Sequence, residues 1–349
     1  MHNQMANEHG STGKIMKRKN DLYEKIYQYD NLYSAFYNAS KGKRKSQEIH
    51  KYALDLEKNI ANLQMQLMQK ELDIGHYTFF KIHDPKPRDI CAASFHERVM
   101  HHAIMNICEP ILDGYAIDDS YACRKNKGTV KAIHRCQYFI RRYPWYLKMD
   151  IKKYFDSIDH AIALKRLAHK IKDKSLLLII EQILDTYHIS QGKGLPLGNL
   201  TSQHIANHYL GVFDHWIKET LRIKGYLRYM DDFVVFGDTK SELKKIHSQI
   251  QDYLWEHLQL ILKHTTQLNR SRIGIPFLGF RIFKDKILLT PNSKKRFIKK
   301  FKQYERKLMR GEWDENEYMS HISPLFAFAE IGDTLEFRKH VLNRFGVLS

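Results

Sequence analysis

Two adjacent carboxylates, Asp231 and Asp232, stand in the middle of an apolar run and constrain the fold more than any other feature. The run reads YLRYMDDFVVFG over residues 226–237. Its flanks are aromatic and β-branched residues, which favour strands, and its polar centre favours a bend. We therefore expect a β-hairpin with both aspartates at its bend. An Asp-Asp pair in a turn often serves only the turn, but here apolar residues surround both charges.

A third carboxylate, Asp150, ends the short apolar run WYLKMDI at residues 145–151. A sheet can place the end of this strand beside the bend of the hairpin. Clustered carboxylates repel one another, so we expect a cation, and hard oxygen ligands suit Mg²⁺ completed by substrate phosphates. Two such ions about 3.5–4 Å apart can activate an attacking hydroxyl and stabilise a leaving pyrophosphate. Because neighbouring strand residues face opposite ways, we expect Asp231 to make the primary metal contact and Asp232 to support it.

The order of elements indicates the fold class. Residues 145–263 read as strand, helix, loop, helix, hairpin and helix, which suits an antiparallel sheet backed by helices, an α+β architecture. Within this range we expect a helix over 164–171, a glycine loop over 192–198, a helix through 205–216 and a helix over 243–262. Outside it we expect two strands joined by a turn at residues 84–87, a helix over 95–112, a strand over 275–283, and basic helices in the last 60 residues.

A long amphipathic helix is predicted between Ser46 and Gly75. Its apolar seam alternates steps of three and four residues, which is the helical period, and consists of Ile49, Ala53, Leu56, Ile60, Leu63 and Leu67. Such a helix packs on the core or docks a partner, and the seam alone does not separate the two.

Composition bounds the function. Lysine and arginine outnumber aspartate and glutamate 57 to 39, a formal net charge of +18, which indicates a polyanionic partner, most commonly nucleic acid, although a merely basic protein has the same signature. The four cysteines form no CxxC pair, so we expect reduced thiols. The chain has no long apolar stretch and no apolar signal-peptide core. We therefore expect a cytoplasmic protein without a membrane partner.

Several blocks in order resemble those of reverse transcriptases. YMDD with LKMDIKKYFDSI upstream looks like the catalytic pair of blocks, PKPRDI the fingers block, SYACRKNKGT the block before the palm, LILK the end of the post-catalytic helix, and FLGF the primer grip. The resemblance covers roughly residues 30–290. It implies a right-hand polymerase fold with fingers, an antiparallel-sheet palm and a helical thumb, and an RNA-directed DNA polymerase activity.

One loop narrows the resemblance. Most bacterial intron reverse transcriptases carry Gln-Gly at its start and Ser-Pro at its end, whereas this chain reads GLPLGNLTSQ, with Leu197 in place of the glutamine and Gln203 in place of the proline. That pairing is similar to reverse transcriptases of diversity-generating retroelements, which copy a template RNA while mutating adenines. The resemblance thus implies mutagenic retrohoming by a bacterial or phage-encoded enzyme.

The resemblance also implies roles for individual residues. Two Mg²⁺ ions, for which Mn²⁺ could substitute, would be held by Asp150, Ile151, Asp231 and Asp232. Nucleotide contacts would come from Arg88, Phe155, Leu197, Gly198, Gln203 and Lys263. Nucleic-acid contacts would come from Arg124, Lys127, Phe277, Gly279, Lys294, Lys299, Lys302 and Arg306.

Several of these residues keep a structural alternative. Phe155, expected to stack under the incoming sugar, could be a core aromatic. Arg88, whose guanidinium fork suits triphosphate oxygens, could be a solvated arginine. Gly198 could be a plain loop glycine, Lys263 a surface lysine, and Leu197 an apolar packing residue.

The implied subdomains are an N-terminal extension over residues 1–75, fingers over 76–144 and 161–192, a palm over 145–160 and 193–290, and a basic thumb over 291–349. The implied partners are a template RNA, the RNA–cDNA duplex, dNTPs and a small basic helical accessory protein. Two alternatives remain: a stand-alone or antiphage-type reverse transcriptase, and a catalytically silent RNA-binding scaffold. The three intact aspartates argue against the scaffold.

Overall fold

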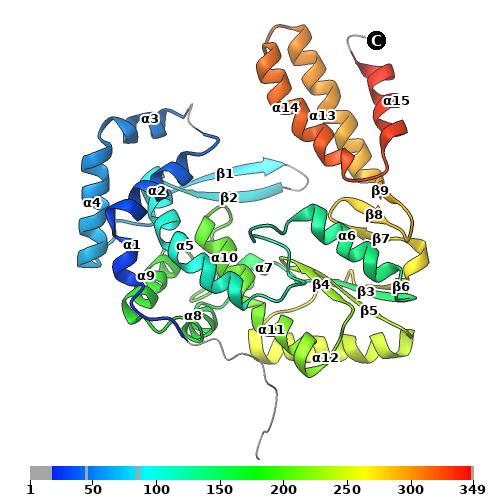
Figure 1. Ribbon diagram of the computed structural model, residues 1–349, viewed down its shortest axis with the longest axis horizontal. Helices are drawn as coiled ribbons and strands as arrows, with labels where there is room; N and C mark the ends of the chain where they lie inside the picture. The colour runs from blue at the N-terminus through cyan, green and yellow to red at the C-terminus, as the bar shows by residue number, and fades with distance from the viewer. Residues whose placement is uncertain (1–17, 44–45, 84–86, 347–349) are drawn as a thin grey trace, which may run out of the picture. The chain divides into compact units, whose positions relative to one another are not determined.

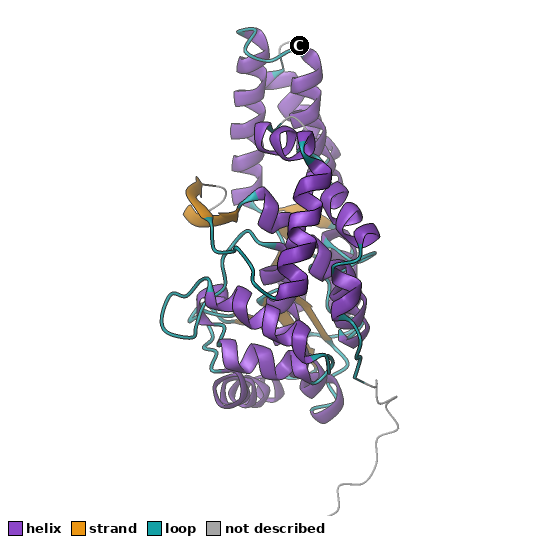
Figure 2. Cartoon of the chain, turned by 90° about the vertical axis from the view of Figure 1, so that its left-hand side faces the viewer, coloured by secondary structure: helices purple, strands orange, loops and turns teal. Residues whose placement is uncertain are grey.

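The computed structural model describes residues 18–43, 46–83 and 87–346. Contacts divide the chain into two compact units, each built from two separate segments. Unit 1 comprises residues 1–116 and 159–209, and unit 2 comprises residues 117–158 and 210–349. These units do not coincide with the expected fingers, palm and thumb, so that division stays a prediction. Most of the described chain is helical, and the strands are confined to short segments (Figure 2).

Unit 1 is a helical body that carries one two-stranded sheet (Figure 1). Its strands β1 (Tyr77–His83) and β2 (Pro87–Ala93) pair antiparallel, as predicted. The turn predicted at residues 84–87 lies mostly outside the described residues. The helices are α1 (Tyr23–Ile26), α2 (Tyr29–Ser40), α3 (Gln47–Leu54), α4 (Leu56–Gln69), α5 (Phe95–Tyr115), α8 (His160–Ala168), α9 (Lys174–Asp185) and α10 (Leu200–Tyr209).

Two helix predictions that involve unit 1 are corrected. The helix expected from Ser46 to Gly75 is broken at Asp55 into α3 and α4, and α4 ends at Gln69, where Lys70 adopts a left-handed conformation. The break shifts the seam, because Tyr52 is buried where Ala53 was expected to be. The helix expected through residues 205–216 is interrupted after Tyr209, where α10 ends.

Unit 2 contains a four-stranded and a three-stranded antiparallel sheet. The four-stranded sheet has the order β4–β5–β3–β6, from β3 (Trp145–Asp150), β4 (Tyr226–Tyr229), β5 (Asp232–Gly237) and β6 (Gln267–Arg270). The three-stranded sheet has the order β7–β8–β9, from β7 (Ile275–Phe277), β8 (Phe280–Ile282) and β9 (Ile287–Leu289). The single strand predicted over residues 275–283 is thus a tight hairpin, because Leu278 and Gly279 both have positive φ and turn the chain.

Helices flank these sheets in unit 2 (Figure 1). They are α6 (Thr129–Ile140), α7 (Tyr154–Ser157), α11 (Gly211–His215), a π-helical turn (Trp216–Thr220), α12 (Lys240–Leu258), a 3₁₀ turn (Ser271–Ile273), α13 (Pro291–Met309), α14 (Glu315–Glu330) and α15 (Leu335–Phe345). The helix predicted to Leu262 ends at Leu258, since Leu262 instead bridges Ile151 in an extended segment.

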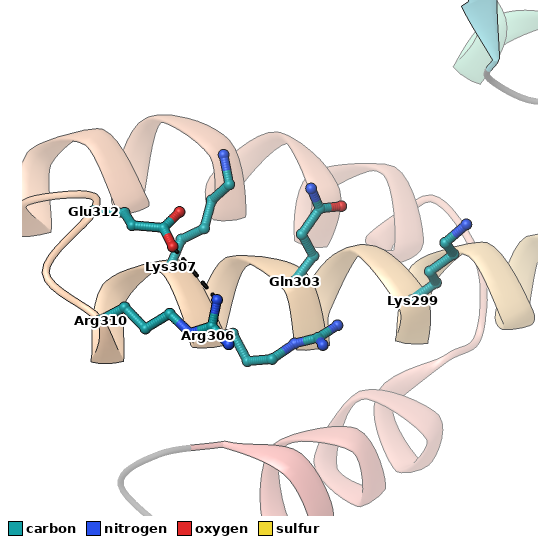
Figure 3. A pocket seen from close by; sticks show the side chains of 6 residues that line it. All are labelled: Lys299, Gln303, Arg306, Lys307, Arg310 and Glu312. Carbon is teal, nitrogen blue, oxygen red and sulfur yellow. Dashed lines mark ion pairs between the residues drawn. The ribbon is translucent and has the colours of Figure 1, made fainter.

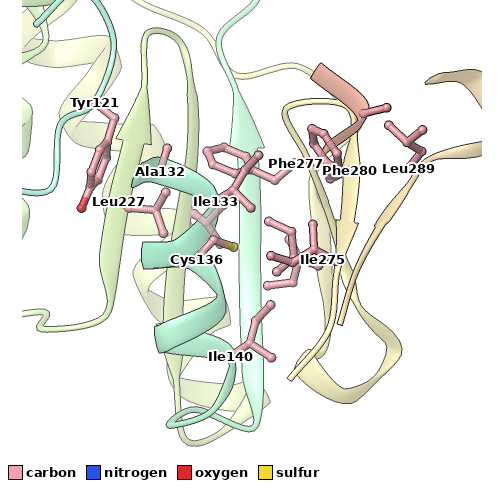
Figure 4. Close-up of a cluster of buried hydrophobic side chains, with 14 of the residues drawn as sticks. Tyr121, Ala132, Ile133, Cys136, Ile140, Leu227, Ile275, Phe277, Phe280 and Leu289 are labelled. Carbon is pink, nitrogen blue, oxygen red and sulfur yellow. The ribbon is translucent and has the colours of Figure 1, made fainter. Parts of the chain in front are cut away.

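One hydrophobic cluster joins both sheets of unit 2 to their helices. The inner face of α6 presents Ala132, Ile133, Cys136 and Ile140 to this cluster, where they meet Leu227 of β4 (Figure 4). The same cluster includes buried residues of β7, β8, β9 and α13. This packing gives β4 and β5 a rigid backing, which is what a hairpin needs if its bend is to hold charged groups in place. In the described part of the chain, no helix is both long and apolar enough to cross a bilayer.

Candidate active site

The three aspartates singled out in the sequence meet in unit 2. Strands β3 and β5 pair so that Asp150 lies directly opposite Asp232, and Asp231 occupies the bend between β4 and β5. Side chains directly opposite in an antiparallel pair have Cβ atoms about 4.5–5.5 Å apart, and like charges there destabilise the sheet. The hairpin prediction is confirmed, and its bend concentrates three negative charges.

Repulsion and burial shift the acidity of the pair. Burial, and after it the Asp150 carboxylate, raises the pKa of Asp231 to about 6. Burial also raises the pKa of Asp232 to about 6, while the neighbouring Lys148 ammonium opposes the rise. Both effects penalise the ionised carboxyls. The site is therefore short of positive charge and gains from any cation it receives.

Two lysines already supply part of that charge. The Lys148 ammonium lies 2.9 Å from Oδ1 of Asp232, and the Lys263 ammonium donates to Oδ1 of Asp150 at 2.6 Å. Lys263 is also anchored through its backbone, whose N–H donates to the Asp150 carbonyl at 2.8 Å. Lys263 thus lies at the carboxylate cluster with its side chain 38 % exposed, and its predicted contact with the nucleotide stays a prediction.

Carboxylate oxygens are the ligands that Mg²⁺ prefers, so the donor chemistry of this cluster fits the expected ions. Within residues 18–43, 46–83 and 87–346, however, no group of three or more His, Cys, Asp or Glu side chains is arranged to hold a metal. The ion pairs give a physical reason, since ammonium groups lie on Asp150 and Asp232. The main chain of Ile151, counted with the ligands in the sequence, bridges Leu262.

Phe155 lies in α7, close after β3 in the chain. Its ring is half-buried, whereas the adjacent Tyr154 is 3 % exposed and belongs to the core. The two rings meet edge to face with centroids 5.9 Å apart. Tyr154 therefore takes the core position that was the alternative for Phe155, and the ring of Phe155 keeps a partly open face.

Three of the nucleotide-contact residues of unit 1 lie in or against strand β2, and the fourth, Gln203, lies in α10. Arg88 is exposed in β2, where its backbone pairs with Ile82, and its side chain makes no hydrogen bond or ion pair to any residue that the structure describes. The Leu197 carbonyl accepts a hydrogen bond from the Cys91 N–H at 2.9 Å, and Leu197 is half-buried. Gly198 has φ +130°, and a Cβ there would lie 3.1 Å from the Cys91 carbonyl oxygen. Only glycine fits this approach to the strand. Gln203 is half-buried in α10.

Arg124 and Lys127 are engaged within their own loop. Arg124 donates to the Ser120 carbonyl at 2.9 Å, and Lys127 donates to the Asp118 carbonyl at 2.7 Å. The Lys127 ammonium also pairs with the Asp118 carboxylate. Both cations stabilise the loop that precedes α6, so their predicted contact with template or triphosphate stays a prediction.

The FLGF block forms the turn between β7 and β8. Phe277 is 1 % exposed, so its ring serves the core and is not free to contact a duplex, which corrects the expectation for this side chain. Gly279 accepts hydrogen bonds at its carbonyl from the Ser293 hydroxyl at 2.7 Å and the Thr290 N–H at 3.0 Å. The turn is thereby tied to the start of α13.

Helix α13 carries the basic residues predicted to contact nucleic acid. Its second half lines an open pocket of about 490 Å³, formed by Lys299, Gln303, Arg306, Lys307, Arg310 and Glu312 (Figure 3). The other two predicted contacts lie elsewhere: Lys294 is 5.5 Å from the ring centroid of Phe337, and Lys302 is 3.8 Å from that of Phe345. The four predicted cations thus divide into a pocket pair and a pair that covers the rings of α15.

Comparison with known proteins agrees with this geometry. The model of the family described as "Reverse transcriptase (RNA-dependent DNA polymerase)" matches residues 81–282, more than half of the chain. The chain belongs to the reverse transcriptase family. Membership confirms the expected enzyme class and the right-hand polymerase fold class, with the α+β character seen in the sheets and helices described above.

Individual relatives are distant. Protein YkfC of Escherichia coli is 23% identical over 273 residues, which cover 64% of this chain and 72% of YkfC. The group II intron-encoded protein LtrA of Lactococcus lactis is 25% identical over 143 residues, which cover 39% of this chain and 24% of LtrA. The structure of apo telomerase from Candida tropicalis aligns with a TM-score of 0.49 at 12% identity, over 71% of this chain and 57% of that chain. The relatives include bacterial and intron-encoded proteins, and none of these three is described by its name as part of a diversity-generating retroelement.

Sequence reasoning missed Lys148, Arg228 and Asp214. Lys148 could have been found, because it stands two residues before Asp150 in the same strand and therefore on the same face. Arg228 could have been noticed less easily, as a charged residue within an apolar strand, because a buried charge needs a partner. The partner, Asp214, follows from no sequence spacing.

Proposed function

We propose that this chain is an RNA-directed DNA polymerase whose reacting centre is the carboxylate cluster of Asp150, Asp231 and Asp232. The observation that carries the proposal is the register of β3 and β5, which sets Asp150 opposite Asp232 beside the bend that holds Asp231. No structural purpose requires three carboxylates in one place, since like charges facing each other destabilise a sheet. A site for phosphoryl transfer needs this concentration of charge, because its catalysis rests on positioning and charge neutralisation.

Asp150, Asp231 and Asp232 would hold the metal ions, with Asp231 as the primary ligand. Two bound Mg²⁺ ions, or Mn²⁺ in their place, would activate the primer hydroxyl and stabilise the leaving pyrophosphate. Lys148 and Lys263 neutralise Asp232 and Asp150 in the protein itself. These ion pairs lower the repulsion between the carboxylates in the folded chain. Lys263, whose side chain is 38 % exposed, would also lie near the departing pyrophosphate.

The substrates proposed are dNTPs and an RNA template with its growing cDNA. Arg88 presents a guanidinium fork with no partner among the described residues, which suits triphosphate oxygens. The partly open ring of Phe155 suits stacking under the sugar. The basic pocket on α13 suits the phosphate backbone of the duplex, because dispersed lysine and arginine contacts supply most of the affinity for nucleic acid. A small basic helical accessory protein is part of the proposal.

The finer proposal is that the enzyme belongs to a diversity-generating retroelement and is error-prone at template adenines. Its support is Leu197, which stands where accurate relatives are expected to carry a glutamine. The Leu197 backbone is fixed on β2 by its hydrogen bond to Cys91, and the residue is half-buried. A leucine there can neither donate nor accept a hydrogen bond to a base pair.

The alternative from a different class is a catalytically silent scaffold that binds RNA with its basic surface. It predicts affinity for RNA without synthesis. A stand-alone or antiphage-type reverse transcriptase would share the synthesis but not the bias at adenine. These alternatives differ in two measurements, which can be made on one preparation.

The deciding experiment is primer extension by the full chain on a heteropolymeric RNA template with a DNA primer. Extension is expected with dNTPs and Mg²⁺, none with EDTA, and none with Asp150→Asn. RNA binding by filter retention is measured in parallel. RNA binding without extension in either Mg²⁺ or Mn²⁺ would establish the scaffold. Extension with an unbiased error spectrum would remove the diversity-generating assignment alone.

A further inference from the structure

A buried ion pair lies beneath the bend that carries the aspartates. Arg228, in β4, and Asp214, in α11, both have side chains with 0% exposure. The guanidinium is bidentate, with Nε donating to Oδ1 at 2.7 Å and one terminal nitrogen to Oδ2 at 2.5 Å. The Tyr226 hydroxyl donates to the same Oδ1 at 2.6 Å. Asp214 is thus held by donors from two positions of one strand.

Stability is a weak reason for such a pair. Removing two charges from water is costly, and well-packed hydrophobic residues of similar volume often stabilise a protein as well or better. Large buried rings lie beside the pair: Phe233 stands opposite Arg228 in the sheet, and its ring meets that of Phe213, the residue before Asp214, with centroids 5.2 Å apart. Hydrophobic residues could therefore fill this place. A reason for keeping the ion pair must therefore be sought in the other hydrogen bonds that the Arg228 guanidinium donates.

A third donor of Arg228 reaches the bend itself. The second terminal nitrogen donates to the Met230 carbonyl at 3.0 Å. Met230 has φ +57°, in the left-handed region that a side chain such as methionine rarely adopts. The next residue is Asp231. The hydrogen bond therefore holds the peptide unit between Met230 and Asp231, and with it the direction in which Asp231 leaves the chain.

The arginine is itself fixed from both sides. Its backbone N–H donates to the Asp119 carbonyl at 2.9 Å, and its carbonyl accepts from the Tyr121 N–H at 3.0 Å. Asp214 orients the guanidinium plane, so the nitrogen that meets Met230 has one direction available. A planar fork transmits this orientation, whereas an ammonium on a flexible stem would not.

We propose that Arg228 is a positioning residue of the active site: oriented by Asp214, it fixes the Met230 carbonyl and so sets Asp231 and Asp232 for metal binding. The proposal rests on the proposed function of the carboxylate cluster. Groups that orient the ligands of a metal without touching it commonly account for 10- to 100-fold in metal affinity or activity. We therefore expect the loss of this contact to weaken metal binding before it weakens the fold.

The test replaces the pair by hydrophobic residues, Arg228→Met with Asp214→Leu, in the full chain. Tyr226→Phe is the matched control, because it removes one hydrogen bond to Asp214 and leaves the contact to Met230. The readouts are thermal unfolding, Mn²⁺ binding by electron paramagnetic resonance without nucleic acid, RNA affinity, and primer extension over a Mg²⁺ titration.

For the double variant we expect unfolding within a few degrees of wild type and unchanged RNA affinity. The Mn²⁺ dissociation constant should rise about tenfold or more, with the Mg²⁺ requirement for extension rising in parallel and the KM for dNTP little changed. Tyr226→Phe should bind Mn²⁺ as wild type does. Arg228→Lys keeps the charge beside Asp214 but cannot donate as a fork, and should show the same loss of Mn²⁺ affinity.

A folded double variant that binds Mn²⁺ like wild type would overturn the proposal and leave Arg228 a packing residue. Failure of both the double variant and Arg228→Lys to fold would overturn it too, because stability alone would then explain the pair. If wild type binds Mn²⁺ but extends no primer, the proposed function fails, and the Mn²⁺ comparison between variants still decides the role of Arg228.

Discussion

The β4–β5 hairpin of unit 2 holds its charges in the core, whereas the β1–β2 hairpin of unit 1 presents its charges and even its aromatic residues to solvent. Phe233, Val234 and Val235 of β5 are fully buried, but Phe79 and Phe80 of β1 are 64% and 47% exposed. Each hairpin carries residues assigned to chemistry. The two hairpins differ in whether their charged side chains have partners of opposite charge within the protein.

At the buried hairpin most charges are paired with an opposite charge; for Asp231 no ion pair is present among the described residues, and its pKa is raised to about 6 instead. Lys148 and Lys263 pair with Asp232 and Asp150, and Arg228 pairs with Asp214. In the exposed hairpin Arg88 has no partner among the described residues. The difference teaches that a charge inside the core must bring its counter-ion with it, since desolvation is costly. A charge in solvent can be left for the ligand.

The largest expected effect lies at the buried hairpin. Asp231→Asn should lower primer extension by about 100- to 1000-fold, the size of losing one electrostatic group in a reacting centre. RNA affinity should stay within about twofold, because it comes from dispersed cations. Single-turnover extension and filter binding measure the two. Parallel loss of RNA binding would mean misfolding and would break the contrast between the hairpins.

The next effect lies at the exposed hairpin. Arg88→Ala should raise the KM for dNTP by about 10- to 100-fold, since hydrogen bonds to charged groups contribute about 1.5–3 kcal/mol. Lys81→Ala is the control on the same hairpin, because Lys81 already has Asp89 at 3.8 Å. Steady-state kinetics should show little change for it. Equal effects of the two substitutions would remove the distinction between paired and free cations.

The raised pKa values of the buried hairpin predict a pH dependence of stability. Burial and the Asp150 carboxylate hold the pKa of Asp231 near 6, above the 3.8 of an ordinary aspartate. The folded chain therefore binds the proton of the Asp231 carboxyl more tightly than the unfolded chain does. The contribution of this bound proton to the stability of the fold is present below about pH 4 and is lost as the pH rises through about 6. In EDTA at pH 8, Asp231→Asn should be more stable than wild type by about 3 kcal/mol, because each pKa unit corresponds to about 1.4 kcal/mol.

Urea unfolding of both proteins between pH 4 and pH 8 measures this difference. The gain should vanish near pH 4, where wild type is protonated too. Asp238→Asn is the control, because Asp238 is exposed just after β5. A gain that does not depend on pH would show that charge repulsion is not its cause.

Helix α13 extends the comparison to a third set of cations. Changing Lys299 and Arg306, which line the pocket, to glutamate should flatten the slope of log affinity against log salt by about 2. Changing Lys294 and Lys302, which lie over the rings of Phe337 and Phe345, should change the slope by less than 1. Between 50 and 200 mM salt the first change amounts to roughly tenfold in affinity. Equal slopes for the two pairs would mean that the pocket has no special part in binding.

The smallest effect concerns Leu197, whose carbonyl is bonded to the exposed hairpin through Cys91. Leu197→Gln should lower misincorporation opposite template adenine more than opposite other bases, with synthesis retained. One hydrogen bond contributes about 0.5–1.5 kcal/mol, or roughly 2- to 12-fold in error rate. Sequencing of cDNA made on one template measures it, with Leu197→Met as the control that adds no hydrogen-bonding amide. Identical error spectra for wild type and Leu197→Gln would leave Leu197 an apolar packing residue.

Much of the site follows from local sequence pattern. The strand that ends on Asp150 and the hairpin that carries Asp231 and Asp232 were both predicted, because strand periodicity and turn chemistry are local properties. Residues 275–283 were predicted as one strand and are a hairpin, since the turn uses a positive φ at Leu278 that no local rule favours. The helix break at Asp55 was not predicted either, because the apolar seam continues through it in the sequence. In the structure the buried residue before the break is Tyr52, which packing of the core decides.

The sequence by itself determined which residues can do chemistry and which elements hold them. The tertiary structure alone decided their partners: Lys148 and Lys263 beside the carboxylates, and Asp214 and the Met230 carbonyl around Arg228. The physical reason is that periodicity reports only the faces of an element, over steps of two to four residues. An ion pair between positions 113 residues apart, such as Lys263 and Asp150, depends on sheet register, and register is set by the packing of the whole core.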